Sequence, residues 1–284
     1  MMLPNDIGLP FFSYGLFRPG QIGFGRLQPF IKNHDQGWHV AGTLLDRDGL
    51  PVLDQGNDEV QGALIRFHDV DAKQAYEVIA SIEPDKLYRW EQSDVRKDKQ
   101  QQKANVLFGR KPRRGSHPFE GLDWDGRKEP LFDAALEVVR ETLDQNRGFE
   151  WDLKPMFRLQ MAYTLLWSAI ERFAAFKYHL GERATEKINQ LANEPAFVSG
   201  LRELVKQPRE VFRTDDPEKK VCLDPTNPEK SLAYYYQIRS NIVHRGKAAV
   251  RDHDILVESL GELLELFQRV LKAEFSTCEP GPQA

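Results

Sequence analysis

The chain has 284 residues, of which 40% are hydrophobic and 29% charged, with a formal net charge of −4. The length fits two globular domains, and the acidic balance excludes a protein that coats long nucleic acid, which needs a large basic excess. Two cysteines, Cys222 and Cys278, are too few for a disulfide framework or a zinc cluster and favour a reducing compartment. Without a signal-peptide pattern or a long apolar span, we expect a cytoplasmic protein with no membrane segment.

Residues 1–110 are predicted to form a small β-rich domain. Two apolar or alternating segments, Trp38–Leu45 and Val60–Phe67, predict strands. Gly42 and Gly62 lie inside them, and glycine within a strand often marks a bulge or a close backbone approach. The sheet is therefore expected to curve tightly or to close into a small barrel. The other predicted elements are strands over Leu9–Phe12, Leu87–Val95 and Ala104–Phe108 and a helix over Ala72–Ile82.

Residues 111–130 are predicted to be a linker, because the segment is rich in glycine, proline and charge. Its basic cluster consists of Arg110, Lys111, Arg113 and Arg114. We expect these side chains to be solvated, with contact to phosphate as the alternative.

Residues 131–277 are predicted to form an all-α bundle of about four long helices, because apolar residues repeat there at helical spacing. One stripe is Leu131, Ala135, Val138, Val139, Thr142 and Leu143; a second is Phe157, Met161, Leu165, Ile170 and Phe173; the clearest is Leu256, Leu260, Leu263, Phe267 and Val270. Prolines between 194 and 230 predict a loop with one short helix near Leu201–Val205. Residues 278–284 are expected to be a disordered tail.

A polar cluster marks the end of the helix predicted over Leu232–Val243. Ile238, Ile242 and Val243 are expected to face the core, and Gly246 is expected to end the helix. That leaves Arg239, Asn241 and His244 as polar groups near the end of this packed helix.

The spacing Arg-x4-His in this segment, IRSNIVHRGK, resembles the HEPN domain family. Members are all-helical bundles that commonly dimerise, and many cleave RNA without a metal ion. The resemblance implies that Arg239 and His244 are the catalytic pair and that the helical domain forms a homodimer. It also implies that Ser240 fills a position where a polar residue is favoured, that Asn241 lies in the site, and that Glu171 matches an acidic residue of an earlier helix.

RNA cleavage without metal needs a base, an acid and positive charge on the developing phosphorane. Histidine can transfer the proton, and arginine can clamp two phosphate oxygens. Residues five apart on a helix lie about 140° apart, so Arg239 and His244 cooperate only if the helix ends or bends between them, or if a second chain contributes. In the alternative interpretation, Arg239 pairs with Glu171 and His244 caps its helix.

The segment Tyr14-Gly15-Leu16-Phe17-Arg18-Pro19-Gly20 resembles the Tyr-Gly-x-Leu-Arg-x-Gly loop of the γ-glutamylcyclotransferase-like family. Gly42-Thr43-Leu44, Val60-Gln61-Gly62, and Glu83 with Tyr88-Arg89 follow in the family's order. The resemblance implies that Glu83 is the general acid/base as a γ-glutamyl substrate cyclises to 5-oxoproline. It further implies that the loop residues Tyr14, Gly15 and Leu16 present backbone N–H groups to the substrate, and that Arg18 and Tyr88 belong to the binding site.

Three residues depart from that family pattern. Leu16 stands where serine or threonine is usual, so one hydroxyl donor is lost. Phe17 replaces an aliphatic residue, and Pro84 rather than glycine follows Glu83. In the alternative interpretation, Glu83 is a surface carboxylate at a helix end.

The expected fold class is α+β: a small mixed, cyclotransferase-like β-barrel followed by an all-α, HEPN-like bundle. The first interpretation is a protein of a prokaryotic defence or stress system that cuts or binds RNA and carries the barrel as a sensor. The second is a γ-glutamylcyclotransferase-like enzyme that acts on a glutamyl-type small molecule and has a helical dimerisation module. The third is a binding protein without catalysis. None of them invokes a metal or a cofactor.

Overall fold

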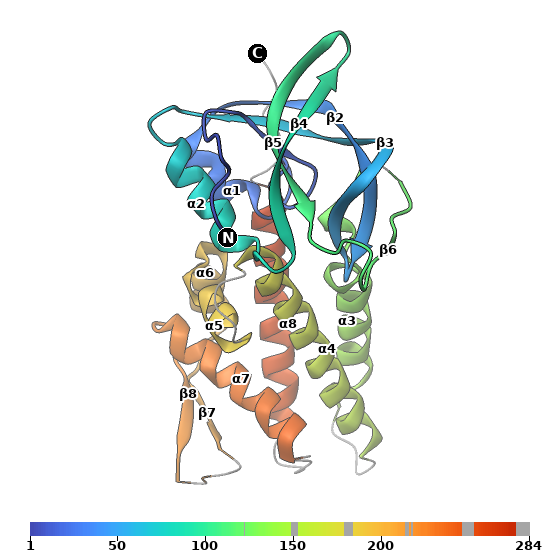
Figure 1. Ribbon diagram of the computed structural model, residues 1–284. Helices are drawn as coiled ribbons and strands as arrows, with labels where there is room; N and C mark the ends of the chain where they lie inside the picture. Colours follow the sequence, from blue (N-terminus) through green and yellow to red (C-terminus); the bar gives the residue numbers. More distant parts are fainter. Residues whose placement is uncertain are drawn as a thin grey trace. The chain divides into compact units, whose positions relative to one another are not determined.

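The computed structural model describes residues 1–121, 123–148, 153–178, 184–213, 216, 218–245 and 253–276. The chain forms two compact units, Met1–Glu129 and Pro130–Ala273. The first is built mainly of strands and the second mainly of helices (Figure 1), which confirms the mixed α+β class. Among the described residues, no helix is both long enough and apolar enough to cross a membrane.

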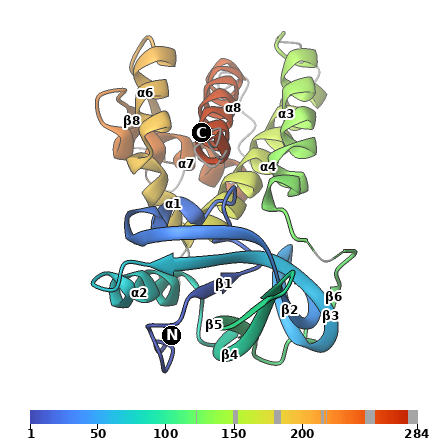
Figure 2. The same cartoon turned by 90° about the horizontal axis from the view of Figure 1, so that it is seen from above.

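Five strands of the first unit close into a barrel (Figures 1 and 2). They are β1 (Phe11–Ser13), β2 (Ile31–Arg47), β3 (Leu50–Phe67), β4 (Tyr88–Lys97) and β5 (Gln100–Gly109). The order is β3-β1-β5-β4-β2, and β2 also pairs with β3, which closes the ring; the short β6 (His117–Pro118) adds to β2. Only β1 and β5 run parallel among the described pairs, so the barrel is mixed.

The glycines inside the two long strands have the roles that their positions predict. The pairing of β2 with β3 shifts register between Gly42 and Thr43. A Cβ on Gly62 would lie 2.5 Å from the carbonyl oxygen of Ser13, so only glycine allows β1 to approach β3 there. Both the bulge and the close approach are thereby confirmed.

Helix α2 (Ala72–Ile82) has the bounds that the sequence predicts and packs on the barrel through Tyr76. The ring of Tyr76 meets those of Phe11, Phe67 and Trp90 edge to face, with centroids 6.5, 5.3 and 5.4 Å away. Its hydroxyl donates a 2.7 Å hydrogen bond to the carbonyl of Leu9. Two short helical turns, α1 (Phe24–Leu27) and η1 (Gln28–Phe30), precede β2.

The segment expected to be a linker belongs to the first unit up to Glu129. Trp124 is buried there, 4% exposed, two residues before the short helix η2 (Gly126–Lys128). The burial of Trp124 therefore fixes this segment to the first unit, although its composition is typical of linkers. The basic residues nearby form surface ion pairs, Arg110 with Asp85 at 3.2 Å and Arg113 with Asp54 at 2.8 Å.

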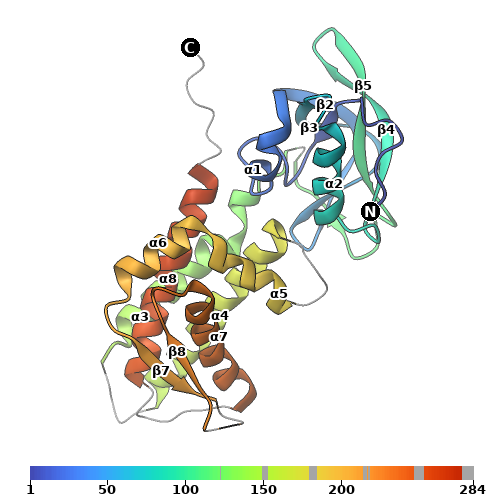
Figure 3. The same ribbon diagram turned by 90° about the vertical axis from the view of Figure 1, so that its left-hand side faces the viewer.

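The second unit is a helical bundle organised around α8 (Figure 3). Its helices are η3 (Pro130–Phe132), α3 (Ala134–Gln145), α4 (Lys154–Lys177), α5 (Ala184–Asn189), η4 (Gln190–Asn193), α6 (Pro195–Leu204), α7 (Pro228–Arg245) and α8 (His253–Ser276). The predicted stripe of α8 is buried at all five positions, which confirms it. Within the core, Phe267 meets Phe132 and Phe173 edge to face.

The prediction of an all-α bundle was wrong, because the second unit also contains a β-hairpin. Strands β7 (Arg209–Phe212) and β8 (Lys220–Leu223) pair antiparallel and lie against α7 (Figure 3). Pro208 and Pro225 indicated a loop in this region, but they lie just outside the two strands and interrupt neither.

Parts of the predicted helix stripes were also wrong. Val138, Phe157, Met161 and Val243 are 49%, 47%, 72% and 47% exposed. On α4 the predicted positions Ile170 and Phe173 are buried, but the rest of the buried face is formed by Leu159, Tyr163, Leu166 and Trp167. Because α4 is apolar around much of its circumference, periodicity alone does not select the inward face.

Candidate active site

A pocket of the barrel unit brings together four segments that are distant in sequence. It lies among the end of β1 with the loop that follows, the start of β3, the end of α2 and the start of β4, and Leu107 of β5 adds a fifth segment. Its polar lining residues are Ser13, Tyr14, Glu83 and Tyr88. The apolar wall includes Phe11, Phe17, Leu50, Pro51 and Leu107. The cavity, about 20 Å³, admits one water-sized group and is partly open to solvent, so a larger ligand would extend out of it.

The loop after β1 is held in place through its carbonyl groups, whereas several of its backbone N–H groups make no hydrogen bond within the described part of the chain. A Cβ on Gly15 would lie 2.7 Å from Cγ of Pro51, so glycine is needed for this wall to close. The carbonyls of Gly15 and Leu16 accept hydrogen bonds from the N–H groups of Arg18 at 3.0 Å and Gly23 at 2.8 Å. Within the described part of the chain, the N–H groups of Gly15, Leu16 and Phe17 donate to no other group. Three consecutive amides are therefore available to an oxygen atom of a ligand.

Glu83 is brought into the pocket by the end of α2. Its N–H still donates to the carbonyl of Ile79 at 2.9 Å, but its backbone is already extended because Pro84 disfavours the helical conformation of the residue before it. Its carboxyl group has no hydrogen-bond partner among the described residues. Burial against the apolar wall raises the pKa of Glu83 from 4.5 to about 8. A carboxyl group with this pKa exchanges protons near neutral pH.

Two tyrosines frame the pocket with hydroxyl groups that are already engaged. The Tyr14 hydroxyl donates to the carbonyl of Leu107 at 2.7 Å and accepts from the N–H of Leu53 at 3.2 Å. The Tyr88 hydroxyl donates to the carbonyl of Pro51 at 3.1 Å. Burial raises both tyrosine pKa values well above 10, and the nearby Glu83 adds to both shifts. Both rings therefore act as neutral supports of the wall.

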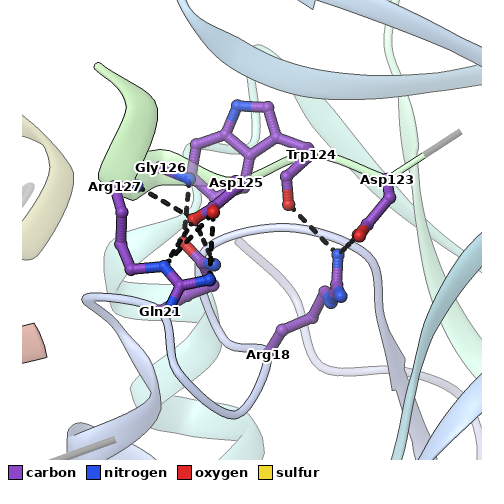
Figure 4. Close-up of polar contacts among 7 residues, drawn as sticks. All are labelled: Arg18, Gln21, Asp123, Trp124, Asp125, Gly126 and Arg127. Carbon is purple, nitrogen blue, oxygen red and sulfur yellow. Dashed lines mark hydrogen bonds and ion pairs between the residues drawn. The ribbon is translucent and has the colours of Figure 1, made fainter. Parts of the chain in front are cut away.

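Of the predicted pocket residues, Arg18 lies elsewhere. Its guanidinium binds the carboxylate of Asp123 and donates to the carbonyl of Trp124 at 3.1 Å (Figure 4). Arg18 is therefore an anchor for the 123–127 segment. In contrast, Tyr14, Gly15 and Leu16 all line the pocket, as do Glu83 and Tyr88.

Residues 123–127, here called the strap, are fastened at several points (Figure 4). Gln21 accepts a hydrogen bond from the N–H of Gly126 and donates one to Asp125, each 2.9 Å long. Burial acts to raise the pKa of Asp125, but hydrogen bonds from Arg127 and Gln21 outweigh it and lower this pKa to about 2. The strap thus holds the loop that carries Arg18 and Gln21, directly after the pocket residues.

Sequence reasoning missed the remaining wall residues of the pocket. Pro51, Leu107 and Ser13 line it, although none of them belongs to the loop motif. Ser13 directly precedes Tyr14, so its place next to the loop motif is a sequence signal that it lines the pocket. Pro51 and Leu107 lie 37 and 93 residues from Tyr14, and only the barrel topology places them there.

In the helical unit, Arg239 of α7 is paired within the chain. Its guanidinium lies 3.1 Å from a carboxylate oxygen of Glu171 on α4 and stacks over the ring of Tyr236, 5.6 Å from its centroid. The two charged side chains are 21% and 35% exposed. The backbone of His244 belongs to α7, but its side chain and Gly246 lie outside the described residues.

The two polar residues between this pair have different surroundings. Asn241 is buried, donates to the carbonyl of Phe212 at 2.9 Å and accepts from Gln237 at 2.9 Å. It therefore fastens the β-hairpin to α7. Ser240 is half-buried on the same helix.

No group of three or more histidine, cysteine, aspartate or glutamate side chains in the described part of the chain is placed to hold a metal ion. Comparisons of the chain with protein-family models, with curated proteins and with solved structures find no match. Function must therefore be inferred from the Glu83 pocket and from the Arg239–Glu171 pair.

Proposed function

We propose that the barrel unit is a small-molecule enzyme in which Glu83 is the general acid/base for cyclisation of a γ-glutamyl-type substrate. This proposal rests on one observation. The carboxyl group of Glu83, with its pKa near 8, lines the same pocket as Gly15, Leu16 and Phe17, whose backbone N–H groups make no hydrogen bond within the described part of the chain. One group exchanges a proton near neutral pH, and the others stabilise negative charge on oxygen. Acyl transfer from an amide requires both functions.

The reaction balances with the groups present. The substrate's α-nitrogen attacks the γ-carbonyl carbon, the new C–N bond closes the lactam, and the bond from that carbon to the leaving amine breaks. Glu83 takes the proton from the attacking nitrogen and returns it to the leaving amine, so the enzyme ends unchanged. The amides of Gly15, Leu16 and Phe17 face the developing oxyanion. With its pKa raised to about 8, Glu83 is mostly protonated at pH 7, and its base form accumulates as the pH rises.

Release of 5-oxoproline from γ-glutamyl amines and γ-glutamyl dipeptides tests the proposal. We expect release by the wild-type chain and a fall of at least about 100-fold in Glu83→Gln, which retains the shape but not the proton transfer. Glu77→Gln is the matched control, because Glu77 lies on the same helix but is exposed. Equal rates in wild type and Glu83→Gln would contradict the proposal.

For the helical unit, RNA cleavage or RNA binding through Arg239 and His244 remains a prediction, as does the homodimer. One observation supports a shared site: Arg239 and Glu171, which the family resemblance connects, do meet across α7 and α4. Because Arg239 already donates a hydrogen bond to Glu171, a phosphate group of RNA would have to compete with that carboxylate for the guanidinium. The barrel pocket is therefore the better-supported site.

A further inference from the structure

Among the hydroxyl groups of the described pocket lining, that of Ser13 alone has no hydrogen-bond partner within the described part of the chain. Ser13 ends β1, opposite Ala63 of β3, and is only 2% exposed. Among the described residues its hydroxyl has no hydrogen-bond partner. It lines the same pocket as Glu83 and the Gly15 loop.

The two tyrosine hydroxyls of the described lining bond to backbone groups, Tyr14 to Leu107 and Leu53 and Tyr88 to Pro51. The Ser13 hydroxyl bonds to no group in the described part of the chain, and the pocket that it lines is partly open to solvent. Water satisfies such a hydroxyl in the ligand-free protein, and a ligand that enters the pocket replaces that water. The Ser13 hydroxyl is therefore a donor that the fold leaves to whatever binds in the pocket.

The neighbouring residues indicate which ligand atom this is. Glu83 is mostly protonated at neutral pH, and the lining contains no lysine or arginine among the described residues. The backbone N–H groups of Gly15, Leu16 and Phe17, which have no acceptor among the described residues, are all hydrogen-bond donors. A hydroxyl that joins three amides in an apolar wall complements a carbonyl oxygen that becomes negatively charged.

We propose that Ser13 is a substrate-binding residue that donates a hydrogen bond to the acyl oxygen of the substrate in the Glu83 pocket. This inference rests on the proposed cyclisation and deepens it by assigning a side-chain donor to the oxyanion. Because the charge develops in the transition state, the bond strengthens as the α-nitrogen attacks. The loss of Ser13 should therefore lower kcat more than it raises KM.

Ser13→Ala tests the assignment with two measurements, one kinetic and one of stability. The kcat/KM for 5-oxoproline release should fall about 10- to 100-fold, mainly in kcat. The melting temperature of the ligand-free protein should change little, because the Ser13 hydroxyl bonds to no other group in the described part of the chain. Ser81→Ala is the matched control, since the Ser81 hydroxyl is exposed and bonded to the Val78 carbonyl on α2. That control should retain wild-type kcat/KM.

The possible failures are distinguishable. A wild-type chain that releases no 5-oxoproline overturns both the proposed function and this inference. If the wild type is active and Ser13→Ala retains its kcat/KM, this inference alone fails. A fall in the melting temperature of Ser13→Ala also overturns it, because the hydroxyl would then be satisfied within the folded protein.

Discussion

The indole N–H of Trp124 donates a 3.0 Å hydrogen bond to the carbonyl oxygen of Gly49. Gly49 lies in the tight turn between β2 and β3, with a positive φ of 73°, directly before the pocket residues Leu50 and Pro51. Arg18 and Gln21, which follow the pocket residues 14–17, bind the same strap (Figure 4). One five-residue segment thus contacts both the loop that follows Phe17 and the turn that precedes Leu50 and Pro51, and both of these segments contribute walls of the pocket.

Trp124→Ala should lower the free energy of unfolding of the barrel unit by about 3–5 kcal/mol, since it removes a buried aromatic side chain and leaves a cavity. Chemical denaturation monitored by circular dichroism measures the change. Arg127→Ala is a suitable control, because the Arg127 side chain is 54% exposed and should matter by at most about 1 kcal/mol. Equal effects of the two variants would show that the strap does not hold the walls.

Gly15→Ala should reduce both stability and 5-oxoproline release, because the new methyl group would lie 2.7 Å from the Pro51 ring. Such overpacking costs about 1–3 kcal/mol and displaces the wall that faces Glu83. Gly25→Ala is the matched control, since a Cβ there meets nothing within 4 Å. A Gly15→Ala enzyme with unchanged kinetics and melting temperature would refute this description of the wall.

Glu83 should make stability depend on pH in a definite direction. Its pKa is about 8 in the folded chain and about 4.5 in the unfolded chain, so between these values only the folded state retains the proton. The free energy of unfolding should therefore fall as pH rises from about 4.5 to about 8, by at most about 1.4 kcal/mol per pH unit. Below and above that window this contribution to the slope vanishes.

Glu83→Gln should flatten that part of the stability profile, and Glu77→Gln should leave it unchanged. In the wild type, kcat/KM for cyclisation should rise with pH through about pH 8, as the base form of Glu83 accumulates. An activity profile that is flat between pH 6 and pH 9 would argue against Glu83 as the base.

Arg209 should be the most sensitive charged residue of the helical unit. It joins β7 to Glu262 and, at 2.9 Å, to Glu258 of α8, and Tyr235 donates a 2.9 Å hydrogen bond to Glu262. Arg209→Met should destabilise the unit by about 3 kcal/mol, because the largely buried Glu262 loses its cation. Arg269→Met, at an ion pair with the exposed Glu203, should change little. Similar melting temperatures for the two variants would contradict the prediction.

If the helical unit cleaves RNA, purified protein should cut tRNA without added metal and leave a cyclic phosphate. His244→Ala and Arg239→Ala should both abolish this, whereas Glu171→Gln should retain it or increase it, because Arg239 is freed for phosphate. Gel analysis of labelled RNA measures the result. Wild-type protein that leaves every RNA intact would restrict Arg239 to its structural pairing with Glu171.

Local patterns in the sequence predict local structure well in this chain. The bounds of α2, the glycines within β2 and β3 and the buried stripe of α8 each follow from spacing alone. The loop motif also brings Tyr14 and Gly15 into one pocket with Glu83, as the family resemblance implies. For α2 and α8 the pattern that makes the prediction lies within one helix, and for the pocket the family resemblance supplies the connection between the loop and Glu83.

Features that depend on distant contacts were not predictable in the same way. Arg18 belongs to the loop motif, but its partner Asp123 lies 105 residues away in a segment with the composition of a linker. Phe157 and Met161 have a helical spacing, yet tertiary packing selected another face of α4. The hairpin in the helical unit is stabilised by Arg209 and by the Asn241 bond to Phe212, and neither contact leaves a periodic pattern.

The short strand β1 pairs with residues on both sides of a wide sequence gap: Phe11 lies opposite Ile65 on β3 and opposite Asn105 on β5. During synthesis, the first of these partners emerges from the ribosome long before the second. Until residue 105 is available, the nascent chain exposes an open sheet edge together with the rings of Phe11 and Phe12, both of which are buried in the finished protein. The growing polypeptide thus has an interval in which β1 is open to aggregation and to binding by a chaperone.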